Sequence, residues 1–314
     1  MSRPFAFVFS GQGSQKLGML SDVAAAHPVV ENTFAEASAV LGYDLWDLCQ
    51  HGEQEQLNQT EITQPLLLTA SVALWRVWEE KQGPLPVWLA GHSLGEWSAL
   101  VCAGVVSFTD AVSLVRKRGA YMQVAVPKGE GSMAAVLNLE DEKIMAICRE
   151  ASDVGVVEAV NFNSPGQVVI AGQVAAVEKA SSLLKAAGAK RVLPLPVSAP
   201  FHTSLMKPAA EQLARDIADV AFHAPRIPVI HNVHARSTSD PEQIRQLMIQ
   251  QVDSPVLWVD CMKALMNAGV ELVMECGPGK VLCGLCGRID KSLVAIGLED
   301  VAGFDSALVA IHQS

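Results

Sequence analysis

Two continuous apolar runs, residues 5–9 and 86–90, each lead into a glycine-containing turn. Runs without polar alternation are typical of parallel strands that are buried on both faces of a sheet. A helical pattern follows the second run at residues 95–103. Residues 229–232 and 270–275 are predicted as two further strands, and Gly-Pro-Gly and a helix follow the last one. Strands that alternate with helices predict a parallel α/β sheet.

The middle of the chain has a different pattern. Strands and helices are predicted in the order βαββαβ, at residues 133–139, 141–152, 156–162, 167–171, 173–187 and 189–197. A hairpin-type turn, Asn163-Ser164-Pro165-Gly166, joins the second and third strands. This order is that of the ferredoxin-like unit. We therefore predict a small ferredoxin-like domain at residues 130–198, inserted into a large α/β domain formed by residues 1–129 and 199–314.

The composition excludes several classes of protein. The chain has 314 residues, of which 50% are hydrophobic and 18% charged, so it can bury a sizeable core. Its formal net charge of −10 gives no general attraction to nucleic acid or to anionic membranes. No apolar stretch is long enough to span a membrane, and the N-terminus lacks the pattern of a secretory signal. We expect a cytoplasmic protein with no nucleic-acid or membrane partner.

The seven cysteines indicate neither a disulfide framework nor a metal site. They lie at positions 49, 102, 148, 261, 276, 283 and 286, mostly beside apolar residues. The last three form a cluster, but a zinc site needs a fourth ligand and none lies close by in the sequence. We expect buried thiols and no metal.

The segment Gly91-His92-Ser93-Leu94-Gly95 stands between the predicted strand 86–90 and the predicted helix, and it fits the Gly-x-Ser-x-Gly nucleophile elbow. Small residues are needed on both sides of the serine because side chains there would clash with neighbouring backbone. Such a turn places Ser93 at a helix N-terminus, where the Leu94 N–H can stabilise an oxyanion. The pattern predicts a nucleophilic Ser93 in a hydrolase-like large domain. The alternative is an ordinary serine in a tight turn.

A serine nucleophile needs a base, and His202 is the best placed of the eight histidines. It lies where the chain leaves the small domain and re-enters the large one, and clefts between domains are common sites. The alternative is a histidine in a surface loop. His92 is next to Ser93 in the sequence, but neighbouring side chains at such a turn diverge. We therefore assign His92 a structural role.

A further candidate, Arg118, is predicted to lie on the apolar face of a helix. Asp110 can cap a helix that continues to about residue 125. The residues that share one face of this helix by their spacing are Ala111, Leu114, Val115, Arg118 and Met122. A buried guanidinium needs an anionic partner. That partner is either a protein carboxylate, in a structural ion pair, or a substrate carboxylate in a bidentate clamp.

Glycines also mark the turn Gly11-Gln12-Gly13-Ser14-Gln15 after the first strand. Such a turn lets backbone approach a ligand closely, although many are plain connections. The turn lacks the lysine and the glycine spacing of a nucleotide-binding P-loop.

Taken together, these motifs resemble those of the malonyl-CoA:acyl carrier protein transacylase family, of the bacterial fatty-acid synthesis type. The matching segments are Phe9-Ser10-Gly11-Gln12-Gly13-Ser14-Gln15, Thr63-Gln64-Pro65, Gly91-His92-Ser93-Leu94-Gly95-Glu96, Arg118-Gly119, Asn161-Phe162-Asn163-Ser164-Pro165, Phe201-His202, Gln251, Pro255-Val256 and Glu275-Cys276-Gly277-Pro278-Gly279. They extend over nearly the full length of the chain, and their order makes the resemblance specific. Trp97, where the family commonly has tyrosine, is a small departure.

The resemblance implies a catalytic role for four of these residues. Ser93 would carry the malonyl ester, and His202 would activate the serine. The backbone N–H groups of Gln12 and Leu94 would form the oxyanion hole.

It also implies roles in binding and support. Arg118 would clamp the malonyl carboxylate, and Gln64 would line the site. Gln251 would orient the imidazole through its carbonyl, in place of the usual acidic member of a triad. In related polyketide domains, a phenylalanine just before the catalytic histidine accompanies a preference for malonyl over methylmalonyl, and Phe201 fits that pattern.

The function implied is transfer of malonyl from malonyl-CoA to the phosphopantetheine thiol of acyl carrier protein, through a seryl ester in a ping-pong reaction that supplies fatty-acid biosynthesis. The implied partners are the carrier protein, malonyl-CoA and CoA, with a monomeric enzyme and no metal or redox cofactor. Three alternatives stay open. They are a serine hydrolase of the α/β-hydrolase type, a non-catalytic scaffold of the same fold, and an acyltransferase that serves a polyketide assembly line.

Overall fold

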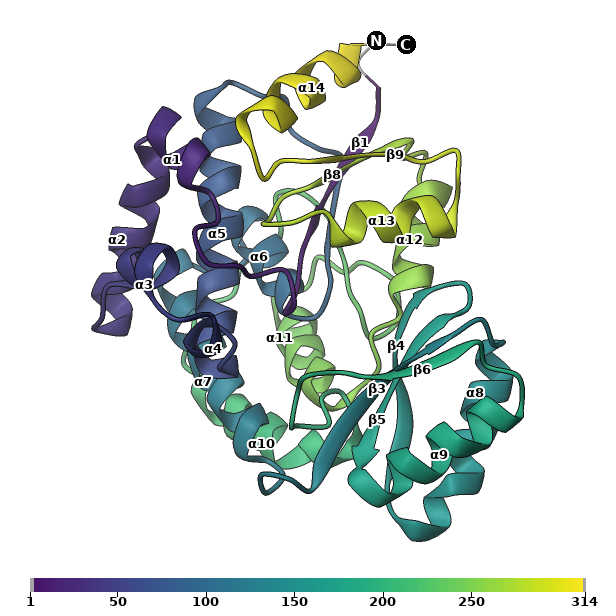
Figure 1. Ribbon diagram of the computed structural model, residues 1–314. Coiled ribbons are helices and arrows are strands. Elements are labelled where there is room, and N and C mark those ends of the chain that lie inside the picture. The colour runs from purple at the N-terminus through teal and green to yellow at the C-terminus, as the bar shows by residue number, and fades with distance from the viewer. Residues whose placement is uncertain (1–2, 313–314) are drawn as a thin grey trace.

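Two β-sheets organise the protein in the computed structural model, which describes residues 3–312 (Figure 1). The larger sheet has five strands in the order β7 (Val229–Ile230), β2 (Trp88–Gly91), β1 (Phe5–Phe9), β8 (Leu272–Glu275) and β9 (Val294–Gly297). All four pairings between neighbouring strands are parallel. The predicted parallel α/β sheet is therefore confirmed.

The central strand β1 shows why its sequence is apolar at every position. Phe5, Phe7 and Phe9 belong to a core that includes Trp75 and Trp78, and the ring of Phe7 lies 5.4 Å and 5.3 Å from the rings of these tryptophans. The intervening Ala6 and Val8 belong to a second core on the opposite face of the sheet. Because both faces are covered, every side chain of this strand lies in one of the two cores, and each position is therefore apolar.

Helices cover this sheet on both faces (Figure 1). The helices outside the smaller sheet's lobe, some of which pack on other helices, are α1 (Ser21–Ala26), α2 (Val29–Leu41), α3 (Leu45–His51), α4 (Gln54–Leu57), α5 (Thr60–Glu80), α6 (Leu94–Cys102), α7 (Phe108–Val124), α10 (Lys207–Ile217), α11 (Pro241–Gln250), α12 (Trp258–Asn267), α13 (Val281–Ile289) and α14 (Val301–His312). Three short 3₁₀ helices are η1 (Ser152–Val154), η2 (Ser204–Met206) and η3 (Gln251–Asp253).

The smaller sheet has four strands in the order β4 (Val157–Ser164), β5 (Gln167–Gln173), β3 (Gly131–Leu137) and β6 (Arg191–Pro194), and every pairing is antiparallel. Helices α8 (Asp141–Ala151) and α9 (Val174–Ala186) share a separate core with one face of this sheet, which forms the lower right lobe in Figure 1. The predicted βαββαβ unit is therefore confirmed. The limits 130–198 for a small domain stay a prediction.

The two lobes meet through the other face of the small sheet. Met133 of β3 and Val169 of β5 point away from α8 and α9 and belong to the same core as β1 and α5. Alternation along a strand sends neighbouring side chains to opposite faces, so one sheet can carry its own helices and still pack on the large domain.

The predicted helix cap at Asp110 is wrong. Helix α7 begins at Phe108, and its N-cap is Ser107, whose hydroxyl accepts a hydrogen bond from the Asp110 N–H at 3.1 Å. The Asp110 carboxylate in turn accepts a hydrogen bond from the Ser107 hydroxyl at 2.6 Å. Both residue types are common at helix starts. Here Ser107 is the N-cap, and Asp110, three positions later, places its negative charge in the first turn, where the helix dipole favours it.

Several strand limits also differ from those predicted. Strand β6 is shorter than residues 189–197, and β5 extends two residues past the predicted end at 171. Strand β7 consists of two residues only. Element ends depend on tertiary hydrogen bonds that a sequence pattern does not contain.

The cysteines agree with the expectation of buried thiols. Six of the seven cysteines are buried and Cys283 is half-buried, and all seven are free thiols. Within residues 3–312, no group of three or more His, Cys, Asp or Glu side chains is arranged to hold a metal ion. No helix in the same range is long and apolar enough to cross a membrane.

Candidate active site

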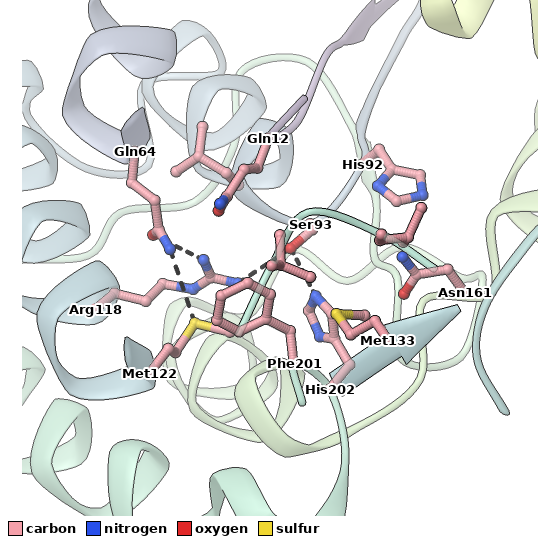
Figure 2. A pocket seen from close by; sticks show the side chains of 13 residues that line it. Gln12, Gln64, His92, Ser93, Arg118, Met122, Met133, Asn161, Phe201 and His202 are labelled. Carbon is pink, nitrogen blue, oxygen red and sulfur yellow. Dashed lines mark hydrogen bonds between the residues drawn. The ribbon is translucent and has the colours of Figure 1, made fainter. Parts of the chain in front are cut away.

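A small cavity of about 110 Å³ lies where the two sheets approach each other (Figure 2). Gln12 and Ser93 reach it from the turns that follow β1 and β2, the adjacent central strands of the large sheet. Met133 and Asn161 reach it from β3 and β4 of the small sheet. The carboxyl ends of parallel strands are the usual position for ligands in such sheets, so the fold itself places this cavity.

The turn that carries Ser93 is strained, and its glycines are required. Ser93 has φ 51° and ψ −109°, a conformation that few non-glycine residues adopt. A Cβ atom at Gly91 would lie 2.0 Å from the backbone of Gly95, and one at Gly95 would lie 2.0 Å from the carbonyl oxygen of Phe9. The Ser93 N–H donates to Oδ1 of Asn232 at 2.8 Å, which helps to hold the turn. The strand, the turn and α6 together form the predicted elbow.

The imidazole of His202 faces Ser93, as Figure 2 shows, although the two residues are 109 positions apart. Oγ of Ser93 lies 2.7 Å from Nε2 of His202. Nδ1 of His202 lies 2.9 Å from the backbone carbonyl oxygen of Gln251, which can only accept a hydrogen bond. Nδ1 therefore carries the proton, and Nε2 is free to accept the proton of the serine hydroxyl.

Burial keeps this imidazole neutral. His202 is 3% exposed, so the alternative of a surface-loop histidine is wrong. Burial first, and the charge of Arg118 second, lower the pKa of His202 to about 3. A neutral imidazole is the form that can act as a base.

The guanidinium of Arg118 lies beside the same serine. Arg118 is 1% exposed on the predicted apolar face of α7. Its Nη1 donates to Oε1 of Gln64 at 2.8 Å, and its Nη2 donates to Oε1 of Gln251 at 3.0 Å and to Oγ of Ser93 at 3.3 Å. Its Nε has no hydrogen-bond partner among the described residues.

These acceptors are all neutral, so residues 3–312 provide no contact ion pair for this cation. Burial lowers the pKa of Arg118 to about 10, against an opposing effect of the Glu96 charge, and the group stays protonated near neutral pH. A buried cation that lines a cavity and lacks a contact anion is suited to bind one. The alternative, a structural ion pair with a protein carboxylate, is therefore absent from the described part of the chain.

Two residues that line the cavity, Gln12 and Leu94, have backbone N–H groups to consider. Leu94 is the first residue of α6, and Gln12 lies in the turn after β1. Neither N–H donates to a backbone acceptor within the part of the chain that the structure describes. Free N–H groups at a helix N-terminus favour negative charge.

His92 points away from the nucleophile (Figure 2). Its Nε2 lies 2.7 Å from Oδ1 of Asn163, and its ring packs 5.5 Å from the ring of Trp258. Burial lowers its pKa. The side chain links the elbow to β4 of the small sheet, in keeping with the structural role assigned to it.

Sequence reasoning assigned no role to three residues next to the site. Glu96 and Asn232 are fully buried beneath the elbow, and Asn161 points into the cavity with an unpartnered Oδ1 within the described part of the chain. Glu96 had a signal, since a charged residue inside the apolar helix pattern 94–102 must find buried partners. Asn161 had only its place in a segment that matches the family, and Asn232 had no signal, because a polar residue in the turn after a two-residue strand carries no local mark of its contacts.

Comparisons with known proteins agree with this geometry. A family model described as "Acyl transferase domain" matches residues 6–288, so the chain is an acyltransferase. It is 56% identical over 304 residues to the malonyl CoA-acyl carrier protein transacylase of Salmonella typhimurium, covering 97% of this chain and 98% of that protein. The chain belongs to the malonyl CoA-acyl carrier protein transacylase family.

Solved structures show the same fold. An acyl carrier protein S-malonyltransferase from Vibrio cholerae superposes with a TM-score of 0.95 at 57% identity, covering 96% of this chain and 99% of that one. A malonyl-transacylase in complex with its type II PKS acyl-carrier protein superposes with a TM-score of 0.96 at 52% identity, covering 99% of this chain and 100% of that one.

Proposed function

We propose that this protein transfers the malonyl group from malonyl-CoA to the phosphopantetheine thiol of an acyl carrier protein, with Ser93 as the nucleophile. The observation that carries the proposal is the position of Arg118. Its guanidinium lies 3.3 Å from the Ser93 hydroxyl in a buried cavity, and its contacts are neutral. An acyl group that ends in a carboxylate would supply the missing anion, whereas acetyl would leave the cation unpaired.

The first half-reaction forms a seryl ester. His202 takes the proton from Ser93 as the oxygen attacks the thioester carbonyl. The resulting oxyanion accepts hydrogen bonds from the N–H groups of Gln12 and Leu94. The carbon–sulfur bond then breaks, and the CoA thiolate takes the proton back from His202 and leaves as a thiol.

The second half-reaction repeats these steps with the carrier. The phosphopantetheine thiol gives its proton to His202 and attacks the ester, and the serine oxygen leaves and recovers the proton. Gln251 orients the imidazole throughout by accepting the Nδ1 hydrogen bond through its main-chain carbonyl, so no carboxylate is needed at that position. The proposed steps require neither a metal nor a redox cofactor.

Arg118 and its neighbours select the acyl group in this proposal. Gln64 holds one arm of the guanidinium, with 2.8 Å between Nη1 and Oε1, and the other arm lies beside Ser93. Phe201 lines the same cavity next to His202 and limits substitution on the malonyl carbon.

The proposal includes an acyl carrier protein as partner. A structure 52% identical to this chain contains a malonyl-transacylase bound to a type II PKS acyl-carrier protein, which supports a carrier as the acceptor. Relatives such as the Salmonella enzyme are malonyl CoA-acyl carrier protein transacylases. We favour a role in fatty-acid biosynthesis, as a monomer in the cytoplasm, and retain a polyketide carrier as the second candidate because of that complex.

The proposal is tested by measuring the mass of the carrier protein after the reaction. The enzyme is incubated with malonyl-CoA and either holo-carrier, which has the thiol, or apo-carrier, which lacks it. We expect a malonyl mass gain on holo-carrier alone, and none with Ser93→Ala. Release of free malonate at the same rate with both carriers would instead identify a hydrolase, and no turnover of any kind would identify a scaffold. Fatty-acid and polyketide carriers offered together distinguish the two pathways by which is loaded faster.

A further inference from the structure

Glu96 is a buried carboxylate that the proposed steps do not use. It is the third residue of α6, three positions after Ser93, and its side chain is about 1% exposed. Oε2 accepts hydrogen bonds from the Asn232 N–H at 3.1 Å and from Nε2 of Gln251 at 2.6 Å. Oε1 lies 2.7 Å from Nδ1 of His231, which is also fully buried. Three donors thus converge on one carboxylate beneath the nucleophile.

The contact with Gln251 determines which way that side-chain amide points. Nε2 of Gln251 faces oxygen atoms only, at 2.6 Å from Glu96, 3.0 Å from the Ser93 carbonyl and 3.4 Å from Oδ1 of Asn232. The shortest of the three is the one to the carboxylate, and hydrogen bonds to a charged acceptor are the strongest. An acceptor-only group at this position therefore excludes the flipped amide, which would turn its oxygen toward Glu96.

With the nitrogen held by Glu96, the oxygen of the same amide faces Arg118. Oε1 of Gln251 accepts from Nη2 of Arg118 at 3.0 Å. In the flipped amide, an NH₂ group would meet the guanidinium donor, and neither could accept. Nη2 of Arg118 would then lose one of its two acceptors and keep only the Ser93 hydroxyl, at 3.3 Å.

We propose that Glu96 is a positioning residue that, by holding the Gln251 amide, keeps the Arg118 guanidinium aligned for the carboxylate of the acyl group. The inference rests on the proposed malonyl transfer, since alignment of the cation matters only for an acyl group that carries an anion. Glu96 does not touch the substrate in this account. It acts through Gln251, and its effect is on selectivity between malonyl and acetyl.

Two substitutions of Glu96 distinguish the effect of its side-chain length from the effect of its charge. Glu96→Asp keeps the charge but withdraws the carboxylate by one methylene, so it cannot serve all three donors. Glu96→Gln keeps the reach and an oxygen acceptor for Gln251 but removes the charge. The readout is kcat/KM for loading of the enzyme from malonyl-CoA divided by that from acetyl-CoA. A change in the folded fraction alters both rates equally and leaves this ratio unchanged.

We expect Glu96→Asp to lower the ratio on the order of tenfold, as for the loss of a hydrogen bond to a charged group. We expect Glu96→Gln to stay within about threefold of the wild type. An unchanged ratio in Glu96→Asp overturns the inference, and so does a larger fall in Glu96→Gln than in Glu96→Asp, because that order identifies charge rather than placement. If Glu96→Asp does not fold, Gln251→Met breaks the same link from the other end and is expected to lower the ratio as much.

Two controls complete the experiment. Glu275→Gln alters another fully buried glutamate, which accepts hydrogen bonds from the N–H groups of Leu282 and Cys283 at the start of α13, and it is expected to leave the ratio unchanged. Arg118→Ala tests the proposed function separately. If Arg118→Ala leaves the ratio unchanged, the clamp itself is wrong. If it lowers the ratio and Glu96→Asp does not, only the role of Glu96 is wrong.

Discussion

Nη2 of Arg118 lies 3.3 Å from Oγ of Ser93, so a buried cation and the proposed nucleophile share one cavity. The same guanidinium lowers the pKa of His202, because a positive charge nearby disfavours a second one. One arginine therefore has two consequences for the reaction. In the proposed reaction it binds an anionic acyl group, and it adds to the effect of burial that keeps the base neutral.

The first prediction concerns selectivity. Arg118→Ala is expected to cost about 3–5 kcal/mol in kcat/KM for malonyl loading, as for removal of one partner of a buried charge pair. Acetyl loading is expected to suffer less, since acetyl has no carboxylate. Loading kinetics with both CoA esters measure the difference.

The matched control is Lys117→Ala on the same helix, where the lysine pairs with Asp216 at 2.6 Å near the surface. It is expected to leave both rates nearly unchanged. Equal losses of malonyl and acetyl loading in Arg118→Ala would mean that the arginine is structural.

The second prediction concerns pH. His202 acts as a base only when neutral, and its pKa of about 3 lies below the ordinary value of 6.5. Nearly all of His202 is therefore neutral at any pH well above this pKa. We expect kcat/KM for acetyl loading to stay level as the pH falls from about 7.5 to 5. Acetyl-CoA is the substrate of choice because it has no acyl carboxylate to titrate.

The cause of the shift can be tested in the same way. In Arg118→Ala the acid limb is expected to move upward, because the charge that disfavours protonation is gone. It is expected to remain below 6.5, because burial is the larger cause. A wild-type acid limb centred at 6.5 or above would contradict this description of the base.

The third prediction concerns the elbow. Gly95→Ala is expected to lower the free energy of unfolding by about 1–3 kcal/mol and to reduce loading, because its Cβ would lie 2.0 Å from the Phe9 carbonyl oxygen. Urea denaturation and malonyl loading measure the two effects. Gly284→Ala is the control, since Gly284 lies on the exposed side of α13 and a Cβ there meets nothing within 4 Å. It is expected to stabilise the protein by about 0.5–1 kcal/mol.

The fourth prediction concerns the methyl group that separates methylmalonyl from malonyl. Phe201→Ser removes a ring from the cavity wall and is expected to raise loading of methylmalonyl relative to malonyl about tenfold, the usual value of one methyl-sized group. Competition between the two CoA esters, read by enzyme mass, gives the ratio. Phe222 is 8% exposed like Phe201 but lies outside the cavity, so Phe222→Ser should leave the ratio unchanged.

Part of this site could be predicted from the sequence because its chemistry depends on local patterns. The elbow needs one glycine two residues before Ser93 and another two residues after it. The apolar face of α7 follows from helical periodicity. Strand β1 has the predicted limits, since its five apolar residues are all buried. Each of these features is complete within a few consecutive residues.

Other parts depend on contacts between distant segments. The amide of Gln251 contacts Ser93, which is 158 positions away, and Glu96, which is 155 away. No pattern around position 251 indicates either partner. Helix α5 was not predicted because it is buried on nearly every side, and a helix without a polar face has no amphipathic period.

The most direct test of the central claim is the mass of the enzyme itself after brief exposure to malonyl-CoA without a carrier. The account predicts a single malonyl adduct that proteolysis and mass spectrometry locate on Ser93, that is absent from Ser93→Ala, and that holo-carrier removes faster than water does. An adduct on another residue, or one that persists in Ser93→Ala, would contradict the account.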